Sequence, residues 1–424
     1  MNPRSYLLGS FSIAVKAADP AHIVPQHLPS PPPKGRTLFV GAGKAAAAMA
    51  LAVENTWPSS VQLDGLVVTR YGHKLPTQRI KVIEAGHPIP DENGEQAARE
   101  ILAAVKALKS DDLLLCLFSG GGSSLLSLPV DGISLQELKE VTHQLLWCGA
   151  RIQEINTVRK HLSAIQGDRL AAACKAPILA LIISDVTGDE ATHIASGPCS
   201  PDPSTFSDAL AVLDQHHLNV PPAVRRILLE GKVHAASETP KPGSPIFSRV
   251  ENKIIASANQ SLLASANYFQ GLKIATLILG DTVTGESREI AKSYAALARE
   301  IRIHPQLLKA PIALLSGGET TVTIKGNGRG GRNSEFLLSL LIELDGLKDT
   351  YALACDTDGL DGTENNAGAL ISPDSLVRAK QLGLNAASFL TNNDAYTFFE
   401  QLNDLVITGP TYTNVNDYRA ILIL

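Results

Sequence analysis

A chain of 424 residues is long enough for two domains, and its 44% hydrophobic content is sufficient for a buried core in each. The net charge of −5 comes from well-mixed acidic and basic residues, with no block of five like charges. This charge pattern does not indicate a protein that binds nucleic acid or a membrane surface. The five cysteines form no C-x-x-C pair, so we expect reduced thiols in the cytoplasm rather than a zinc site or a disulfide framework.

The first half of the chain alternates short apolar runs with segments of helical spacing. An amphipathic N-terminal helix is predicted, with Leu7, Phe11, Val15 and Ala18 on one face. Strands are predicted at Thr37–Val40, Gly65–Thr69, Lys81–Ala85, Leu113–Phe118 and Pro177–Ser184. Helices are predicted at Ala45–Asn55, Glu95–Lys109, Ser134–Trp147 and Val158–Ala173. Even the most apolar run, Ala176–Ile183, is far shorter than the ~20 residues that span a bilayer.

The second half repeats this alternation after a segment that contains Pro240, Pro242, Gly243 and Pro245. We therefore predict domains at residues 1–240 and 241–424. Strands are predicted at Lys253–Ala256, Ile274–Leu279, Ile312–Leu315, Tyr351–Cys355 and Leu405–Thr408, and helices at Gln260–Gln270, Ser287–Arg302, Ser334–Leu344 and Asp394–Leu402. The last strand, Ala420–Leu424, is a candidate to return to the first domain. The prediction is an α/β fold with a mostly parallel, helix-covered sheet in each domain.

Two glycine-rich loops follow apolar strands at matching places in the two halves. LLCLFSGGGSS ends at Ser124, and ALLSGGETT ends at Thr321. Glycines let the backbone approach a ligand and point successive N–H groups into one concavity, and serine hydroxyls add donors. The alternative is a tight turn without a ligand. Because the pattern occurs twice at the carboxyl ends of strands, it favours phosphate binding.

The segment Gly41–Ala46 reads G-x-G-x-x-A between a strand and a helix, which is the pattern of a dinucleotide-binding turn. No acidic residue ends the next strand to bind a ribose, although Arg70 there is compatible with NADP. Lys44 instead places a cation beside the backbone amides at a helix start, where phosphate oxygens bind well. The chain has no Walker G-x-x-x-x-G-K-[ST] motif.

Carboxylates follow two other apolar strands. Asp185 and Asp189 can hold Mg²⁺ or accept a hydroxyl proton, or they can simply form a turn and a helix cap. The segment Asp356–Gly362 contains three aspartates but lacks the glutamate of a calcium loop, so magnesium, a substrate hydroxyl or a helix-capping turn are its alternatives.

Three further segments are candidates for ligand contacts. Arg332, in a glycine-rich basic loop before a helix, is suited to bidentate contacts with phosphate or carboxylate. Asn156–His161 either supplies anion contacts or opens a helix. His87 is as consistent with a structural histidine as with a ligand contact.

Taken together, these segments resemble the glycerate 2-kinase family. The matching phrases are VGAGKAA, EAGHPIPDENG, LFSGGGSSLL, NTVRKHLS, SDVTGDEATHIASGP, GESREIA, LLSGGETTVT, GRGGRNSEFLL, DTDGLDG and TGPTYTNVNDY, which run from Val40 to Tyr418. The resemblance implies a Rossmann-like N-terminal domain and a smaller C-terminal domain of the MOFRL type. It also implies transfer of the ATP γ-phosphoryl group to the 2-hydroxyl of D-glycerate. We further expect Mg²⁺ as the accompanying ion and either a monomer or a homodimer.

The resemblance also implies roles for individual residues. It places Lys44, Asp185 and Arg332 at the catalytic centre. We predict substrate or phosphate contacts from Ser119, Gly120, Gly121, Gly122, Ser123, Arg159 and Asp189. Nucleotide contacts are predicted from Gly317, Gly318, Glu319 and Asn333, and metal contacts from Asp358 and Asp361. This chain departs from the family at Gln166-Gly167-Asp168-Arg169, where Lys-Gly-Gly-Arg is usual, at Glu364-Asn365-Asn366, and at Tyr412, where Gly is usual.

Two other functions remain as alternatives. The first is an NAD(P)H-dependent hydroxypyruvate reductase, which GAGKAA and Arg70 favour and which the missing ribose acid and the lack of a His–acid pair oppose. The second is a non-catalytic binder of small phosphorylated acids, which would not need Asp185.

Overall fold

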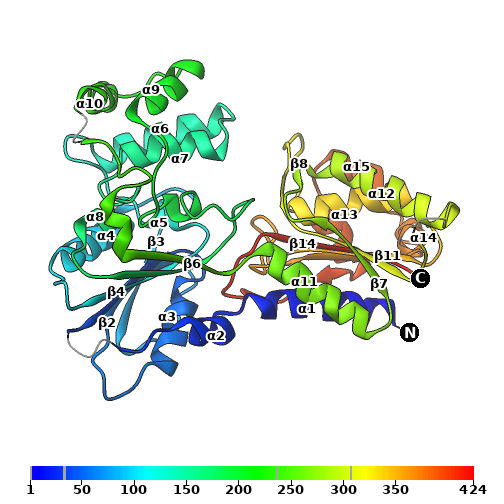
Figure 1. Ribbon diagram of the computed structural model, residues 1–424. Helices are drawn as coiled ribbons and strands as arrows, with labels where there is room; N and C mark the ends of the chain where they lie inside the picture. The colour runs from blue at the N-terminus through cyan, green and yellow to red at the C-terminus, as the bar shows by residue number, and fades with distance from the viewer. Residues whose placement is uncertain (1, 32–34, 235–236, 306–307) are drawn as a thin grey trace. The chain divides into compact units, whose positions relative to one another are not determined.

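The computed structural model describes residues 2–31, 35–234, 237–305 and 308–424, and contacts divide the chain into two units. One unit is Pro20–Ile255. The other combines the residues up to Asp19 with Ala256–Leu424. The predicted two-domain α/β fold is confirmed, and each unit contains its own six-stranded sheet (Figure 1).

The sheet of the Pro20–Ile255 unit has the strand order β3-β2-β1-β4-β5-β6. Its strands are β1 (Thr37–Ala42), β2 (Asp64–Arg70), β3 (Ile80–Ala85), β4 (Leu113–Phe118), β5 (Ile178–Ile183) and β6 (Val250–Ala256). β1 pairs in parallel with β2 and β4, β2 with β3, and β4 with β5, as predicted. From β1 the chain adds β2 and β3 on one side, and it then returns to add β4 and β5 on the other side of β1. α/β proteins bind ligands at such a switch point, beyond the carboxyl ends of the strands.

Helices surround this sheet and form a separate cluster beside it. They are α2 (Pro20–Ile23), α3 (Ala46–Thr56), α4 (Glu92–Lys106), α5 (Gly122–Leu125), α6 (Leu135–Trp147), α7 (Ile152–His161), α8 (Arg169–Ala173), α9 (Phe206–Gln215) and α10 (Pro222–Val233). α6, α7, α9 and α10 gather away from the strands and share an apolar core that includes Val158, Phe206 and Leu213 (Figure 1). Short 3-10 helices lie at Val24–His27, Ile194–Ser196 and Pro245–Arg249.

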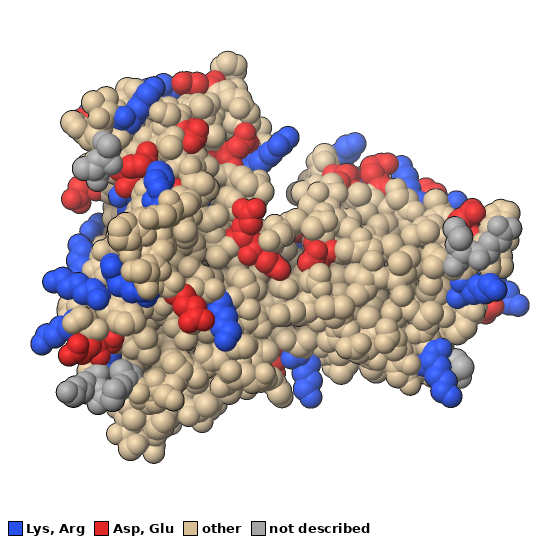
Figure 2. Space-filling model, viewed as in Figure 1, with Lys and Arg blue, Asp and Glu red and all other residues tan. Residues whose placement is uncertain are grey.

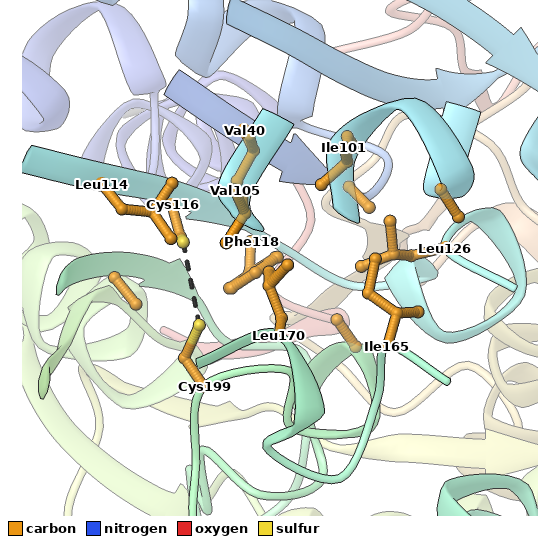
Figure 3. Packing of buried hydrophobic residues seen from close by; sticks show 14 of the residues in the cluster. Val40, Ile101, Val105, Leu114, Cys116, Phe118, Leu126, Ile165, Leu170 and Cys199 are labelled. Atoms are coloured by element: carbon orange, nitrogen blue, oxygen red, sulfur yellow. Dashed lines mark hydrogen bonds between the residues drawn. The ribbon is translucent and has the colours of Figure 1, made fainter. Parts of the chain in front are cut away.

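The core beneath the sheet explains why β4 has no polar residue. All of β4 from Leu114 to Phe118 is buried, and the Cys116 thiol lies 3.8 Å from that of Cys199 (Figure 3). Leu170 of α8 points into the same cluster. A strand that is covered on both faces must be apolar throughout, which is the pattern that the sequence shows.

The helix predicted at Val158–Ala173 is wrong as a single element. It is divided into α7, which ends at His161, and α8, which begins at Arg169. Gly167 and Asp168, directly before α8, adopt left-handed backbone conformations with φ of +58° and +67°, and a helix cannot continue through such residues. These two residues belong to the segment where the chain departs from the family pattern.

The second sheet differs from the prediction in strand direction. Its order is β13-β12-β11-β14-β9-β7, and only β7 and β9 pair in parallel. The pairs β9–β14, β14–β11, β11–β12 and β12–β13 are antiparallel. The strands are β7 (Ala275–Gly280), β9 (Ile312–Ser316), β11 (Thr350–Asp356), β12 (Gly368–Ile371), β13 (Leu405–Val406) and β14 (Asp417–Ile423). The inner strands β9, β11, β12 and β14 are almost entirely buried, so their composition resembles that of parallel strands.

The helices of this unit are α1 (Pro3–Ala17), α11 (Ala258–Gly271), α12 (Ser287–Ile303), α13 (Arg332–Leu344), α14 (Ser375–Gln381), α15 (Ala386–Thr391) and α16 (Ala395–Leu402). Two short strands, β8 (Thr284–Glu286) and β10 (Glu319–Thr321), pair with each other. β8, β10 and β12, which are each only three or four residues long, were not predicted.

The predicted domain boundary at residue 240 is wrong in three respects. β6 belongs to the first sheet rather than the second, so the proline-rich segment forms a connection within the first unit. β14 lies in the middle of the second sheet and does not return to the first. α1 packs beside α11 (Figure 1), and the Ser261 and Ser265 hydroxyls donate 2.8 Å hydrogen bonds to the Ala14 and Ser10 carbonyls. Proline content therefore marked a surface loop and not a boundary.

The surface carries both charge signs. On the face drawn in Figure 2, lysine and arginine side chains are interspersed with aspartate and glutamate. Within the described ranges, none of the helices combines the length and the apolar character that a membrane span requires.

Candidate active site

Two predicted loops meet at the switch point of the first sheet. The Lys44 backbone N–H donates to the Gly120 carbonyl at 2.8 Å, and the Ala45 N–H donates to Ser119 Oγ at 3.0 Å. Gly43 has φ of +142°, and a Cβ atom there would collide with Ser119. The residue must therefore be glycine for the loops after β1 and β4 to approach each other this closely.

The glycine-rich loop after β4, Ser119–Ser124, brings three predicted residues together. Gly121 has φ of +79° and opens α5, and a Cβ atom there would lie 2.9 Å from the His87 ring and 3.4 Å from Lys44 Cγ. Lys44 is half-buried, and α3 begins two residues after it. Backbone N–H groups at helix starts, glycine-rich turns and a lysine side chain are the groups that bind phosphate oxygens in proteins. The structure therefore brings Lys44, Gly121 and His87 to one place.

A chain of hydrogen bonds leads from this loop to Arg159. Ser196 Oγ lies 2.8 Å from Ser123 Oγ and 3.1 Å from Asn156 Oδ1, and Arg159 Nη1 donates to the same Asn156 oxygen at 3.0 Å. Arg159 is half-buried, and burial lowers its pKa to about 10. The Gln166 amide donates to the Ser123 carbonyl at 2.7 Å, which fixes the loop from its other side.

Asp185 and Asp189 follow β5, whose carboxyl end lies beside that of β4. Both are half-buried, and the Asp189 N–H donates to the Val186 carbonyl in a turn where Asp189 has φ of +56°. Asp185 therefore lies at the same edge of the sheet as the two phosphate-type loops, as predicted from its place in the sequence.

The segment after Asp189 holds a strained backbone. Ala195 and Ser196 have φ of +52° and +56°, although neither is glycine. A side chain in the left-handed region costs about 1 kcal/mol or more, and such strain is often concentrated at functional sites. The strain here brings Ser196 Oγ to Ser123.

Lys160 and His161, the two residues after Arg159, have structural partners. Lys160 Nζ donates to Thr192 Oγ1 at 2.7 Å and forms a buried 3.3 Å ion pair with Asp202. His161 Nε2 lies 2.9 Å from Glu238, and burial lowers the pKa of this histidine. Of the three basic residues in this turn, Arg159 is the one without an ion pair to any described residue.

Asp168 is a buried carboxylic acid beneath this site. Its side chain is 0% exposed, and neither carboxyl oxygen has a hydrogen-bond partner among the described residues. Its backbone N–H donates to the Gly197 carbonyl at 2.7 Å, next to the strained Ser196. Burial raises its pKa to about 8, and Asp202 adds to this effect while Arg249 opposes it. Asp168 is therefore mostly neutral at pH 7.

Asp168→Asn is expected to increase stability more at alkaline than at acidic pH. The pKa of Asp168 is about 8 in the folded protein, and that of an unfolded aspartate is about 4. The folded state therefore binds more protons between these values, and the stability that Asp168 contributes falls as the pH rises. Chemical denaturation should show a gain from Asp168→Asn that is about 3 kcal/mol larger at pH 8 than at pH 5. The exposed control Asp111→Asn should show no such dependence, and a pH-independent gain in Asp168→Asn would contradict the assignment.

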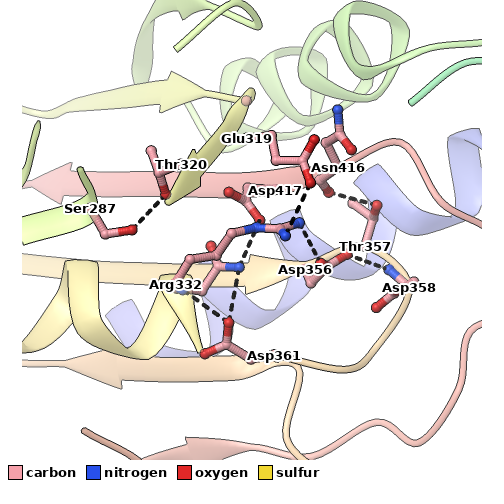
Figure 4. Close-up of polar contacts among 12 residues, drawn as sticks. Ser287, Glu319, Thr320, Arg332, Asp356, Thr357, Asp358, Asp361, Asn416 and Asp417 are labelled. Atoms are coloured by element: carbon pink, nitrogen blue, oxygen red, sulfur yellow. Dashed lines mark hydrogen bonds and ion pairs between the residues drawn. The ribbon is translucent and has the colours of Figure 1, made fainter. Parts of the chain in front are cut away.

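In the second unit, Arg332 is held by three carboxylates. Its Nε donates to Asp417 at 2.7 Å, Nη2 to Asp356 at 2.7 Å, and Nη1 to Glu319 at 3.2 Å (Figure 4). These carboxylates outweigh the effect of burial and raise the pKa of Arg332 well above its usual range. Arg332 is thus permanently charged and fixed in one orientation, with three of its five N–H groups engaged.

Asp361 differs from its predicted role as a metal ligand. Its Oδ1 accepts hydrogen bonds from the backbone and side-chain nitrogens of Asn333, and its Oδ2 accepts from the N–H and hydroxyl of Ser334. Because both oxygens accept from the first turn of α13, the fully buried carboxylate caps that helix. Asp358 is also buried, and its Oδ1 accepts from the Leu360 N–H.

A buried arginine, Arg419, donates hydrogen bonds to the loop around Gly317, which we predict to bind the nucleotide. Arg419 of β14 donates to the Gly317 carbonyl and to Thr320 Oγ1, each at 3.0 Å, and pairs with Asp417. Gly318 has φ of +107°, and a Cβ atom there would collide with the Val283 carbonyl. Asn333 donates to Asp417 at 2.8 Å.

The structure thus forms two clusters from the predicted residues. In the first unit the loops that carry Lys44 and Ser119–Ser123 lie together, with Asp185 at the same sheet edge and Arg159 joined by hydrogen bonds. In the second unit Arg332 pairs with Glu319, and Arg332 and Asn333 both donate to Asp417. Ser196, Asp417 and Arg419 were not among the predicted site residues. Asp417 and Arg419 were detectable as two charges at alternate positions of an otherwise apolar strand.

Two family models match the sequence. One, described as a domain of unknown function (DUF4147), matches residues 6–229. The other, the MOFRL family, matches residues 312–417. The two matches fall on the two halves of the chain that carry the two clusters.

Curated proteins of similar sequence carry two kinds of name. A protein of Agrobacterium vitis named "Putative hydroxypyruvate reductase" is 47% identical, over 100% of this chain and 95% of its own length. The D-glycerate 2-kinase of Thermotoga maritima is 40% identical, over 92% of this chain and 91% of its own length. Among solved structures, that of a glycerate kinase from Thermotoga maritima matches with a TM-score of 0.89 and 38% identity, over 99% of both chains.

Proposed function

This chain belongs to the glycerate 2-kinase family, and we propose that it transfers the γ-phosphoryl group of ATP to the 2-hydroxyl of D-glycerate, giving 2-phosphoglycerate and ADP. The observation that carries this proposal is the pairing of two phosphate-type loops at the switch point, with Lys44 between them. Phosphoryl transfer needs mainly positioning and neutralisation of charge, and these loops offer both.

Most of the predicted residues have a proposed part in this reaction. Lys44 neutralises charge on the transferred phosphoryl group, while Ser123 and the N–H groups of Gly120 and Gly121 orient its oxygens. Ser119 is fully buried and its Oγ accepts from the Ala45 N–H, so its part is to hold the two loops together. Asp185 orients or deprotonates the attacking hydroxyl. Arg332 supplies a second permanent positive charge, and Gly317, Gly318, Glu319 and Asn333 are proposed as nucleotide contacts.

Mg²⁺ is the ion we propose to accompany ATP. Within the described part of the chain, no group of three His, Cys, Asp or Glu side chains is arranged to hold a metal ion. Mg²⁺ is commonly bound by one or two carboxylates together with substrate phosphates and water, so Asp185 and Asp189 fit such a site. Bound there, the ion would neutralise phosphate charge. Asp361 does not fit, because its oxygens cap α13. Asp358 stays a candidate ligand.

We also propose that the protein acts in the cytoplasm. All five cysteines are free thiols, and four of them are buried. Free thiols are the usual state in a reducing compartment.

Hydroxypyruvate reduction is the second candidate function. The name of the Agrobacterium vitis relative favours it, as does the GAGKAA turn at the switch point. β2, however, ends in Thr69 and Arg70, so the acidic residue that binds the ribose of NADH is missing from this strand. This leaves NADPH as the cofactor for that alternative.

The test compares both reactions with the same protein. ATP, Mg²⁺ and D-glycerate are supplied, ADP formation is followed, and phosphorus NMR identifies the phosphorylated hydroxyl. Hydroxypyruvate with NADH or NADPH is assayed in parallel. Glycerate-dependent ADP formation with 2-phosphoglycerate as product supports the kinase. Oxidation of NAD(P)H without kinase activity would replace it by the reductase, and ligand binding without either turnover would indicate a binding protein.

A further inference from the structure

Arg159 occupies an unusual electrostatic position. Its guanidinium is half-buried at the end of α7, and no carboxylate among the described residues lies within ion-pair distance. Its neighbours Lys160 and His161 on the same turn are satisfied by Asp202 and Glu238. A partly desolvated cation normally has an anionic partner, because removing charge from water is costly. The burial that lowers the Arg159 pKa is therefore the condition that a bound anion would relieve.

The direction of this guanidinium is set by its neighbours. Asn156 Oδ1 accepts from Arg159 Nη1 and from Ser196 Oγ, and the Asn156 amide nitrogen lies 3.5 Å from the His193 carbonyl. Ser196 is held by a left-handed backbone and contacts Ser123 Oγ. These contacts hold the guanidinium next to the glycine loop, and the hydrogen bond to Asn156 occupies one of its five N–H groups.

Resting on the proposed kinase function, we propose that Arg159 binds the carboxylate of the hydroxy-acid substrate, and that Asn156 and Ser196 are positioning residues that aim it. A carboxylate is planar and accepts two parallel hydrogen bonds from a guanidinium, which suits the N–H groups that Asn156 does not use. The 2-hydroxyl of glycerate is on the carbon attached to this carboxylate, and the 3-hydroxyl is one carbon further. Anchoring the carboxylate beside Ser123 therefore presents the 2-hydroxyl to the phosphoryl group at the glycine loop.

Arg159→Met tests the carboxylate contact, with Arg151→Met as the matched control, because Arg151 is the exposed residue directly before α7. Arg159→Met is expected to raise the KM for D-glycerate by about 10- to 100-fold, since a charge-assisted pair is lost. The KM for ATP should change little. The ratio of 2- to 3-phosphoglycerate should also fall, which a structural defect alone would not cause. The control should match wild type.

Two substitutions at Asn156 test the positioning role. Asn156→Asp keeps the shape but places a carboxylate against Arg159, where it competes with the substrate. The KM for D-glycerate should rise, and by more than in a variant that only loses the acceptor oxygen. Asn156→Ala is that variant: it removes the acceptor without adding charge, so its KM should rise less.

The outcomes separate this inference from the function itself. If wild type phosphorylates glycerate and Arg159→Met keeps its KM and product ratio, Arg159 does not bind the carboxylate. If both Asn156 variants keep the wild-type KM for D-glycerate, the positioning role is overturned. If wild type does not phosphorylate glycerate, the proposed kinase function fails. In that case, loss in Arg159→Met of the thermal stabilisation by D-glycerate would still support the carboxylate site.

Discussion

Replacing Lys44 with alanine is expected to lower kcat for glycerate phosphorylation by on the order of 10³-fold. The ammonium group is the cation that we place on the transferring phosphoryl group, and removing one electrostatic contact to a transition state costs about 10²–10³ or more in rate. The backbone should keep its place, because the Lys44 N–H donates to Gly120 and alanine retains that donor. The loss should therefore appear in kcat and in phosphorus NMR of the product, with an unchanged circular dichroism spectrum.

Two further variants sharpen this prediction. Lys44→Arg retains charge but changes the shape of the cation, so it should restore only part of the rate. Lys109→Ala removes an exposed lysine from a surface turn and should leave kcat unchanged. If Lys44→Ala turned over within about threefold of wild type, Lys44 would have no role in charge neutralisation.

Asp417→Ala is expected to destabilise the second unit by about 3–5 kcal/mol, because it leaves buried charges without a partner. Asp417 is 2% exposed and accepts hydrogen bonds from Arg332, Asn333 and Arg419. Arg419, itself 1% exposed, would lose its carboxylate while still buried beneath the Gly317 loop. Urea denaturation should show a lower transition midpoint for this unit.

The matched control is Asp214→Ala, which breaks the exposed ion pair with Arg225. Exposed pairs contribute about 0–1 kcal/mol, so this variant should unfold close to wild type. Asp417→Asn keeps the shape and an acceptor oxygen and should fall between the two. A midpoint for Asp417→Ala that equals that of Asp214→Ala would mean that the buried network contributes nothing to stability.

β1 to β5 of the first unit could be predicted to within two residues at each end, whereas β6 was assigned to the wrong unit and the pairing in the second unit could not be predicted. β4, for example, is predicted and observed at Leu113–Phe118, because a fully covered strand is apolar along its whole length and ends abruptly. β14 is equally buried, yet it pairs antiparallel with both of its neighbours. Burial on two faces removes the alternation that would have revealed strand direction, and direction depends instead on contacts between distant segments.

The same distinction applies to the candidate sites. Loops such as Ser119–Ser124 can be recognised in the sequence, because glycines in succession are rare where a backbone has no special conformation to adopt. The residues that contact these loops cannot be recognised in this way. Ser196 reaches Ser123 only because two residues before Gly197 adopt left-handed conformations, and Asp361 meets α13 across a long stretch of sequence. Such contacts are products of tertiary structure, which residue spacing does not encode.

The placement of α1 has a consequence for the order in which the protein folds during synthesis. Pro20–Ile255 is one continuous stretch, so its contacts can form while the later residues are still being translated. α1 leaves the ribosome earlier, but its partner α11 lies beyond that whole stretch, and β14 is made after every other strand of its sheet. The apolar face of α1 therefore stays exposed while an entire unit is synthesised. This makes α1 the first segment that chaperones would bind.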